Sequence, residues 1–187
     1  MNFVLRGTAA ARGRRSRNGF LRRIFARSHL PKRINALAFD PVSGDLWDQQ
    51  NGDDSFDELN RVTAGANLGW IQAMGPIARV AEYKAIELAL APGDLQQQRW
   101  AAREIADTPE LARSRLFMLS GATYVDPKFS WKYAIAPAAI GFLRGDALGA
   151  EYANDLFVGA SRPTLDNGYL LRLDLSSNRQ EIASADA

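Results

Sequence analysis

The sequence contains no cysteine and one histidine among its 187 residues. The lack of cysteine excludes disulfide frameworks, thiolate metal sites and cysteine nucleophiles. No apolar run approaches the roughly 18 residues that a membrane-spanning helix needs. The glycine motifs GxGxxG, Walker A and GxSxG are also missing, which removes the commonest nucleotide-binding and hydrolase classes. The remaining composition, 47% hydrophobic and 24% charged, is typical of a soluble globular domain.

Acidic residues are absent from residues 1–33, which carry ten Arg or Lys side chains. The other 154 residues carry 13 basic and 21 acidic side chains, so the basic character belongs to this segment alone. We expect residues 1–33 to be a poorly ordered extension. Three interpretations of this segment stay open: a degraded leader, a transit peptide, or an arm that binds an anionic membrane or nucleic acid. Nothing in the rest of the chain calls for a polyanion, so we expect no nucleic-acid partner.

The rest of the chain carries mainly strand signals. Two apolar runs within Ile34–Trp47 flank the turn residues Asp40–Asp45, which predicts a β-hairpin. A polar loop, 51–58, precedes a short strand at Leu59–Val62 and a compact loop at 63–70. Further apolar runs follow Gly121 at the spacing expected for a sandwich, a barrel or a propeller.

Residues 73–120 interrupt the strand pattern. Strong helix formers fill Leu95–Ala106, and Thr108 and Pro109 are the N-cap and N1 residues expected of a second helix. We therefore expect one or two short helices inserted between strands. No repeat of 40–50 residues is visible, so periodicity does not select the propeller over the other all-β folds.

The acidic loop is the first candidate site. It offers Asp53, Asp54, Asp57 and Glu58, with Gly52 where backbone can approach a ligand closely. Backbone carbonyls and carboxylates are the oxygen donors that Ca²⁺ prefers, although the spacing is not that of an EF-hand. The alternative is an ordinary solvated surface turn.

Two regions resemble the PQQ-dependent sugar dehydrogenases of the glucose/sorbosone dehydrogenase type. The first is AFDPVSGDLWDQQNGDDSFDELNRVTAGANLGW, residues 38–70, which is similar to AFDPxTGxLW…E-[HNQ]-G…DE[LI]N…GxN[FY]GW. The second runs from Tyr124 to Arg162 and is similar to a later blade of that family. The resemblance implies a mainly β fold, namely a partial six-bladed β-propeller of about three blades, over residues 34–182.

The resemblance also implies roles for individual residues. The carbonyls of Gly52 and Asp53 would hold Ca²⁺, while Glu58 would bind the metal or brace the loop. Asp57 would lie beside the catalytic base. The residues expected to contact PQQ are Lys32, Arg33, Asn51 and Arg162, of which Arg162 could equally be an ordinary surface arginine.

Several positions depart from the family pattern. The family's base is a His in an H-x-G-G context, whereas His29 has no following glycines. Lys32 and Arg33 stand where the family has Arg-Asn, and Lys does not replace the planar fork of Arg. The pair Gln49-Gln50 stands where Thr-Glu is common, which removes one carboxylate from the loop.

These observations favour an oxidoreductase acting on CH–OH groups, with a sugar or aldose as substrate and PQQ and Ca²⁺ as cofactors. The chain would be a fragment or divergent member, inactive by itself. The alternatives are a non-catalytic propeller-like binding module and, third, a basic-tailed nucleic-acid binder. The family is periplasmic or secreted, but no h-region precedes the domain here, so the location stays open, as does the oligomeric state.

Overall fold

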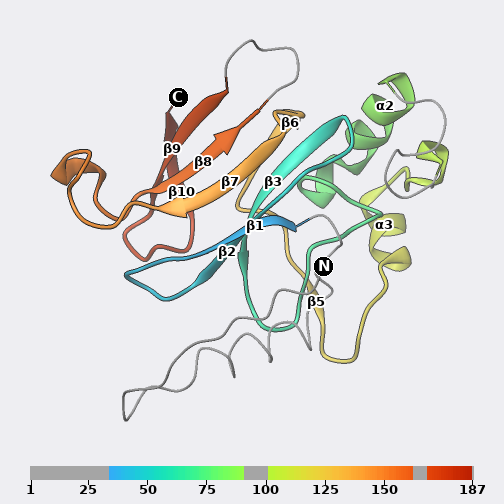
Figure 1. The fold of residues 1–187 in the computed structure, drawn as a ribbon. Coiled ribbons are helices and arrows are strands. Elements are labelled where there is room, and N and C mark those ends of the chain that lie inside the picture. The colour runs from blue at the N-terminus through green and yellow to red at the C-terminus, as the bar shows by residue number, and fades with distance from the viewer. Residues whose placement is uncertain (1–33, 91–100, 162–167, 187) are drawn as a thin grey trace, which may run out of the picture.

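Two four-stranded antiparallel sheets form most of the structure, a computed structural model that describes residues 34–90, 101–161 and 168–186 (Figure 1). The first sheet contains β1 (Ile34–Phe39), β2 (Leu46–Gln50), β3 (Ser55–Val62) and β6 (Phe129–Tyr133). The second contains β7 (Pro137–Phe142), β8 (Leu156–Ala160), β9 (Tyr169–Leu175) and β10 (Ile182–Asp186). In each sheet the spatial order of the strands follows the chain. The expectation of a mainly β fold is confirmed.

The predicted hairpin is present as β1 and β2. The carboxylate of Asp40 accepts hydrogen bonds from the Val42 N–H at 2.9 Å and from the Ser43 hydroxyl at 2.8 Å. Gly44 supplies the left-handed position at φ 79°, and its N–H donates to the Asp40 carbonyl. The turn residues therefore close the hairpin as their types predict.

The insertion between β3 and β6 is helical, as predicted, but its helices differ from those expected. It contains the 3₁₀ turns η1 (Ile77–Arg79) and η2 (Ala102–Glu104), the helices α2 (Val80–Leu90) and α3 (Pro109–Arg115), and the short parallel strands β4 (Ala66–Asn67) and β5 (Thr123–Tyr124). Thr108 caps α3 as predicted, since its hydroxyl accepts from the Leu111 N–H. A further 3₁₀ turn, η3 (Ala150–Tyr152), lies between β7 and β8.

Two sequence predictions are wrong in this region. The described part of Leu95–Ala106 is not an α-helix: Ala101 and Ile105 are extended around the single turn of η2. Its apolar side chains are buried among the helices, so tertiary packing overrides helix propensity. The loop expected at 51–58 also ends early, because β3 begins at Ser55.

The molecule has two main apolar cores. One lies between the sheets, where Trp47 and Leu59 pack with Leu156, Val158 and Leu173. The other lies under the insertion and includes Phe56, Met74, Ile77, Val80 and Tyr83. Figure 1 shows α2 and α3 gathered beside β3, with the second sheet on the opposite side. The first sheet thus lies between the second sheet and the insertion.

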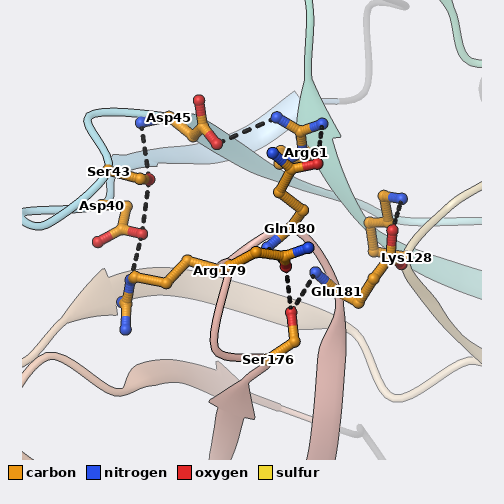
Figure 2. Close-up of polar contacts among 10 residues, drawn as sticks. Asp40, Ser43, Asp45, Arg61, Lys128, Ser176, Arg179, Gln180 and Glu181 are labelled. Carbon is orange, nitrogen blue, oxygen red and sulfur yellow. Dashed lines mark hydrogen bonds and ion pairs between the residues drawn. The ribbon is translucent and has the colours of Figure 1, made fainter.

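Polar contacts close the rim between the two sheets (Figure 2). The turn between β9 and β10 presents Arg179, whose Nε donates to Asp40 Oδ2 at 2.5 Å and whose guanidinium also donates to the Asn154 carbonyl. Arg61 pairs with Asp45 at 3.0 Å, and Lys128 pairs with Glu181. Burial alone would raise the pKa of Asp40, but Arg179 and the hairpin donors together lower it. The Arg179–Asp40 pair therefore favours the ionised carboxylate and fixes one sheet to the other.

We expect Arg179→Ala to lower the free energy of unfolding by about 3 kcal/mol at pH 7, because the fully buried Asp40 carboxylate loses its counter-charge. Since folding lowers the Asp40 pKa, this contribution is present at neutral pH and disappears as the pH falls through the folded-state pKa. Urea unfolding at pH 7 and pH 3 measures both effects. Arg103→Ala, at a side chain that is 73% exposed, is the control. An equal loss for both variants would contradict the expectation.

Candidate functional site

The candidate metal loop, Asn51–Asp54, connects β2 to β3. Gly52 is buried in it, and a Cβ added there would lie 1.7 Å from the carbonyl oxygen of Ser55. No side chain fits in that space without moving the backbone. Only glycine therefore permits this loop shape, which brings several backbone and side-chain oxygens into one short segment.

The fully buried Asp57 carboxylate organises the loop. Its Oδ1 accepts from the Gly52 N–H at 2.8 Å. Its Oδ2 accepts from the N–H groups of Ile135 and Ala136 at 2.6 and 2.9 Å. Residues 134–136 connect the two sheets, so one carboxylate joins the candidate metal loop to the inter-sheet crossover. Three buried backbone N–H groups, which would otherwise lack an acceptor, are thus satisfied by one side chain.

Further contacts converge on the crossover. The Ala134 N–H donates to the Asp54 carbonyl at 3.2 Å, and Gln49 Nε2 donates to the Pro137 carbonyl at 2.8 Å. The Ser161 N–H donates to the Ala136 carbonyl at 3.0 Å. The end of β8 is thereby held next to the loop that Asp57 organises, immediately before Arg162.

Glu87 of α2 reaches the same loop from the insertion. Its Oε1 accepts from the Ser55 hydroxyl at 2.6 Å and from the Asp54 N–H at 3.2 Å. Burial raises the pKa of Glu87, and the nearby Asp54 and Asp53 carboxylates raise it further, against the lowering effect of these two hydrogen bonds. Besides Asp57, a second buried acid therefore belongs to the surroundings of the loop.

Glu58 has a different environment from Asp57, since successive strand residues point to opposite faces. Its Oε1 accepts from the Gly75 N–H at 2.5 Å, and its neighbours on this face are Asn60 of the same strand and Asp48 and Gln50 of β2. All four side chains are buried. Burial raises the pKa of Glu58, and burial raises the pKa of Asp48 to about 6, while the Gln50 and Asn60 amides lower it. Glu58 thus fixes the Gly75 loop.

The structure brings Asn51, Gly52, Asp53 and Asp57 together and places Glu58 on the other face of the sheet. Lys32, Arg33 and Arg162 lie outside the described residues, as does His29. Within the described ranges, no group of three His, Cys, Asp or Glu side chains is arranged to hold a metal ion. A cation at the loop would therefore depend on backbone carbonyl and amide oxygens as well as on carboxylates.

Sequence reasoning missed Glu87 and Asp48. Glu87 occupies an i+7 position from Val80 on the buried face of α2, where an apolar residue is usual. Asp48 follows Trp47 in a strand in which every residue is buried. Neither carries a motif. The available signals were the helical spacing of Val80, Tyr83 and Glu87 and the alternation along β2.

Comparisons with known proteins give similarities in sequence and in fold. The sequence profile of the Glucose / Sorbosone dehydrogenase family matches residues 9–88. An uncharacterised protein of Synechocystis sp. is 28% identical over 151 residues, which are 81% of this chain and 28% of that protein. A glucose dehydrogenase structure shares the fold with a TM-score of 0.53 at 21% identity, over 85% of this chain and 36% of that chain. The apo form of the soluble aldose sugar dehydrogenase of Escherichia coli shares the fold with a TM-score of 0.52 at 19% identity. The match covers 85% of this chain and 35% of that chain.

The predicted family resemblance is therefore confirmed: the chain is related over part of its length to the glucose/sorbosone dehydrogenases. The profile match begins inside the basic segment 1–33, contains the motif region 38–70 and ends at residue 88 in α2. The chain spans about a third or less of the length of these relatives. No helix in the described part of the chain is long and apolar enough to cross a membrane.

We expect Asp57→Asn to lower the free energy of unfolding by about 3 kcal/mol, because an amide NH₂ would face backbone donors that a carboxylate now satisfies. Hydrogen exchange at Gly52, Ile135 and Ala136 should accelerate together, since the three N–H groups share one acceptor. The exposed change Asp146→Asn is the control. Faster exchange at Gly52 alone would contradict a single link between loop and crossover.

Asp48 should make the protein less stable as the pH rises. Because the folded-state pKa is about 6 and the usual value is 3.8, the folded state binds the proton more strongly between these values. Relative to Asp48→Asn, the wild type should therefore lose about 2 kcal/mol of stability between pH 4.5 and pH 7.5. Urea unfolding at both pH values measures this difference. A stability difference that does not change with pH would contradict the raised pKa.

Proposed function

We propose that this chain is part of a β-propeller sugar dehydrogenase that uses PQQ and Ca²⁺, and that it contributes the cation-binding loop Asn51–Asp54. The observation that carries the proposal is the Asp57 carboxylate, which holds the Gly52 loop against the crossover between two sheets. The motif resemblance at residues 38–70 places the family's metal loop at this same segment. The relation to glucose/sorbosone dehydrogenases supports an oxidoreductase acting on a sugar.

The loop fits a hard cation. The donors that it offers are oxygens, namely backbone carbonyls, the Asn51 amide and the Asp53 carboxylate, and Ca²⁺ accepts such mixed oxygen ligands in flexible geometry. Because Gly52 has no Cβ, the backbone of the loop can lie close to Ser55. We assign the cation to the carbonyls of Gly52 and Asp53, with Asn51 beside the cofactor.

When bound, PQQ would supply the hydride acceptor for oxidation of a sugar hydroxyl, polarised by Ca²⁺. The residues of this chain orient the cation loop and neutralise the carboxylates of the cofactor. Asp57 is a positioning residue that fixes the loop through backbone N–H groups. Arg162 follows Ser161 in the sequence, and together with Lys32 and Arg33 it is assigned to the carboxylates of the cofactor.

We assign the two sheets as consecutive propeller blades, and their topology supports this assignment. Each is a four-stranded meander in chain order, and their first strands, β1 and β7, lie against each other. Four-stranded sheets arranged around a central axis are the propeller pattern. The chain spans 36% of a glucose dehydrogenase that shares its fold, so the base and the remaining blades are assigned to sequence beyond this segment.

Titration of the chain with PQQ, with and without Ca²⁺, tests the proposal. We expect saturable PQQ binding that depends on Ca²⁺, with affinity at least tenfold lower in Gly52→Ala because the loop must open around the new Cβ. The control is Gly141→Ala, where a Cβ meets nothing within 4 Å. Circular dichroism and thermal unfolding confirm that both variants fold.

The outcome also separates the two functional alternatives. Dye reduction with glucose in the presence of PQQ and Ca²⁺ would show turnover by this chain itself. Ca²⁺-dependent PQQ binding without turnover would place the base on another segment. No PQQ binding by a folded chain would contradict the proposal and favour a propeller-like module that binds other ligands.

A further inference from the structure

The buried face of α2 contains one acid among apolar residues. Val80 and Tyr83 pack into the core under the insertion, whereas Glu87, one turn further along the same face, is fully buried against the candidate metal loop. A carboxylate is a costly choice for a helix position that faces a core. Its position under Asp54 and Ser55 gives it a contact that an apolar residue could not make.

The Glu87 carboxylate is only half satisfied. Two donors, the Asp54 N–H and the Ser55 hydroxyl, reach Oε1, while the buried Oε2 has no hydrogen-bond partner among the described residues. Among the described residues, no Lys or Arg forms an ion pair with Glu87, and the charges near it are the acids Asp53 and Asp54. A negative group in this position lacks a counter-charge, and a cation held by the loop would supply one.

We propose that Glu87 of the helical insertion is a positioning residue of the cation loop, which it holds through Asp54 and Ser55 and to which it adds a buried negative charge. This inference rests on the proposed function, because the loop must bind a cation for the charge to act. Glu87 is not assigned as a direct ligand, in agreement with the absence of a three-acid metal cluster in the described ranges. The insertion thereby belongs to the site.

The roles of hydrogen bonding and charge can be separated by two substitutions. Glu87→Gln keeps an oxygen that accepts from Asp54 and Ser55 but removes the charge. Glu87→Ala removes both. Glu104→Gln, at a side chain in the same insertion that is 55% exposed, is the matched control. Tb³⁺, a luminescent substitute for Ca²⁺, and Ca²⁺ competing against it are the probes, used with the full chain without PQQ.

We expect Glu87→Gln to weaken Tb³⁺ and Ca²⁺ binding about tenfold while Glu104→Gln leaves it unchanged, since only the former removes a charge near the loop. Hydrogen exchange at Asp54 should accelerate at least tenfold in Glu87→Ala and stay near wild type in Glu87→Gln. This second measurement needs no cation. It therefore tests whether Glu87 holds the loop in place even if a variant binds no cation.

Each failure has a distinct meaning. Equal cation affinity in wild type and Glu87→Gln would overturn the role of the charge and leave the proposed function intact. An unchanged rate of hydrogen exchange at Asp54 in folded Glu87→Ala would overturn the proposal that Glu87 holds the loop in place. A wild-type chain that binds neither Tb³⁺ nor Ca²⁺ would overturn the proposal that the loop binds a cation. The proposed role of the Glu87 charge would be overturned with it.

Discussion

The contacts of the Asp57 carboxylate are the constraint on which the site depends. Two irregular segments, the loop at Gly52 and the crossover at Ile135 and Ala136, expose N–H groups that no strand can satisfy. A buried N–H without an acceptor costs about 1–3 kcal/mol, so three of them would be incompatible with a marginally stable domain. One side chain accepts from all three. The packing of the sheets and the shape of the candidate site are therefore fixed by the same group.

Strand β3 separates two environments because its side chains alternate. Asp57 and Leu59 lie on the face that meets the second sheet, where Leu59 joins the apolar core between the sheets. Glu58 and Asn60 lie on the other face, next to Asp48 and Gln50 of β2. One face thus orients the crossover and the candidate metal loop, while the other fixes the loop at Gly75. Adjacent acids in one motif, Asp57 and Glu58, consequently have unrelated roles.

Local rules predicted the elements whose residues act through their neighbours in sequence. The hairpin turn at Asp40 and Gly44 and the cap at Thr108 follow from side-chain and backbone contacts within three or four residues. Elements that depend on distant partners were missed or misplaced. The start of β3 was predicted as part of a polar loop. Its polar residues are paired with Ile135 and Glu87, which are far along the chain and could not be recognised as partners from the sequence.

The same distinction between near and distant partners in sequence explains which residues of the candidate site could be predicted. The motif alone grouped Asn51, Gly52, Asp53 and Asp57, and the structure brings them together because all four lie within one turn and the strand that follows it. Glu58 belongs to the same motif, but its partner Gly75 lies in the insertion and could not be found from the motif. Glu87 is separated from Ser55 by 32 residues and lies in an insertion without any motif. The motif therefore names candidate site residues that are close in sequence, whereas the residues that hold them in place are distant in sequence and become visible only when the chain is folded.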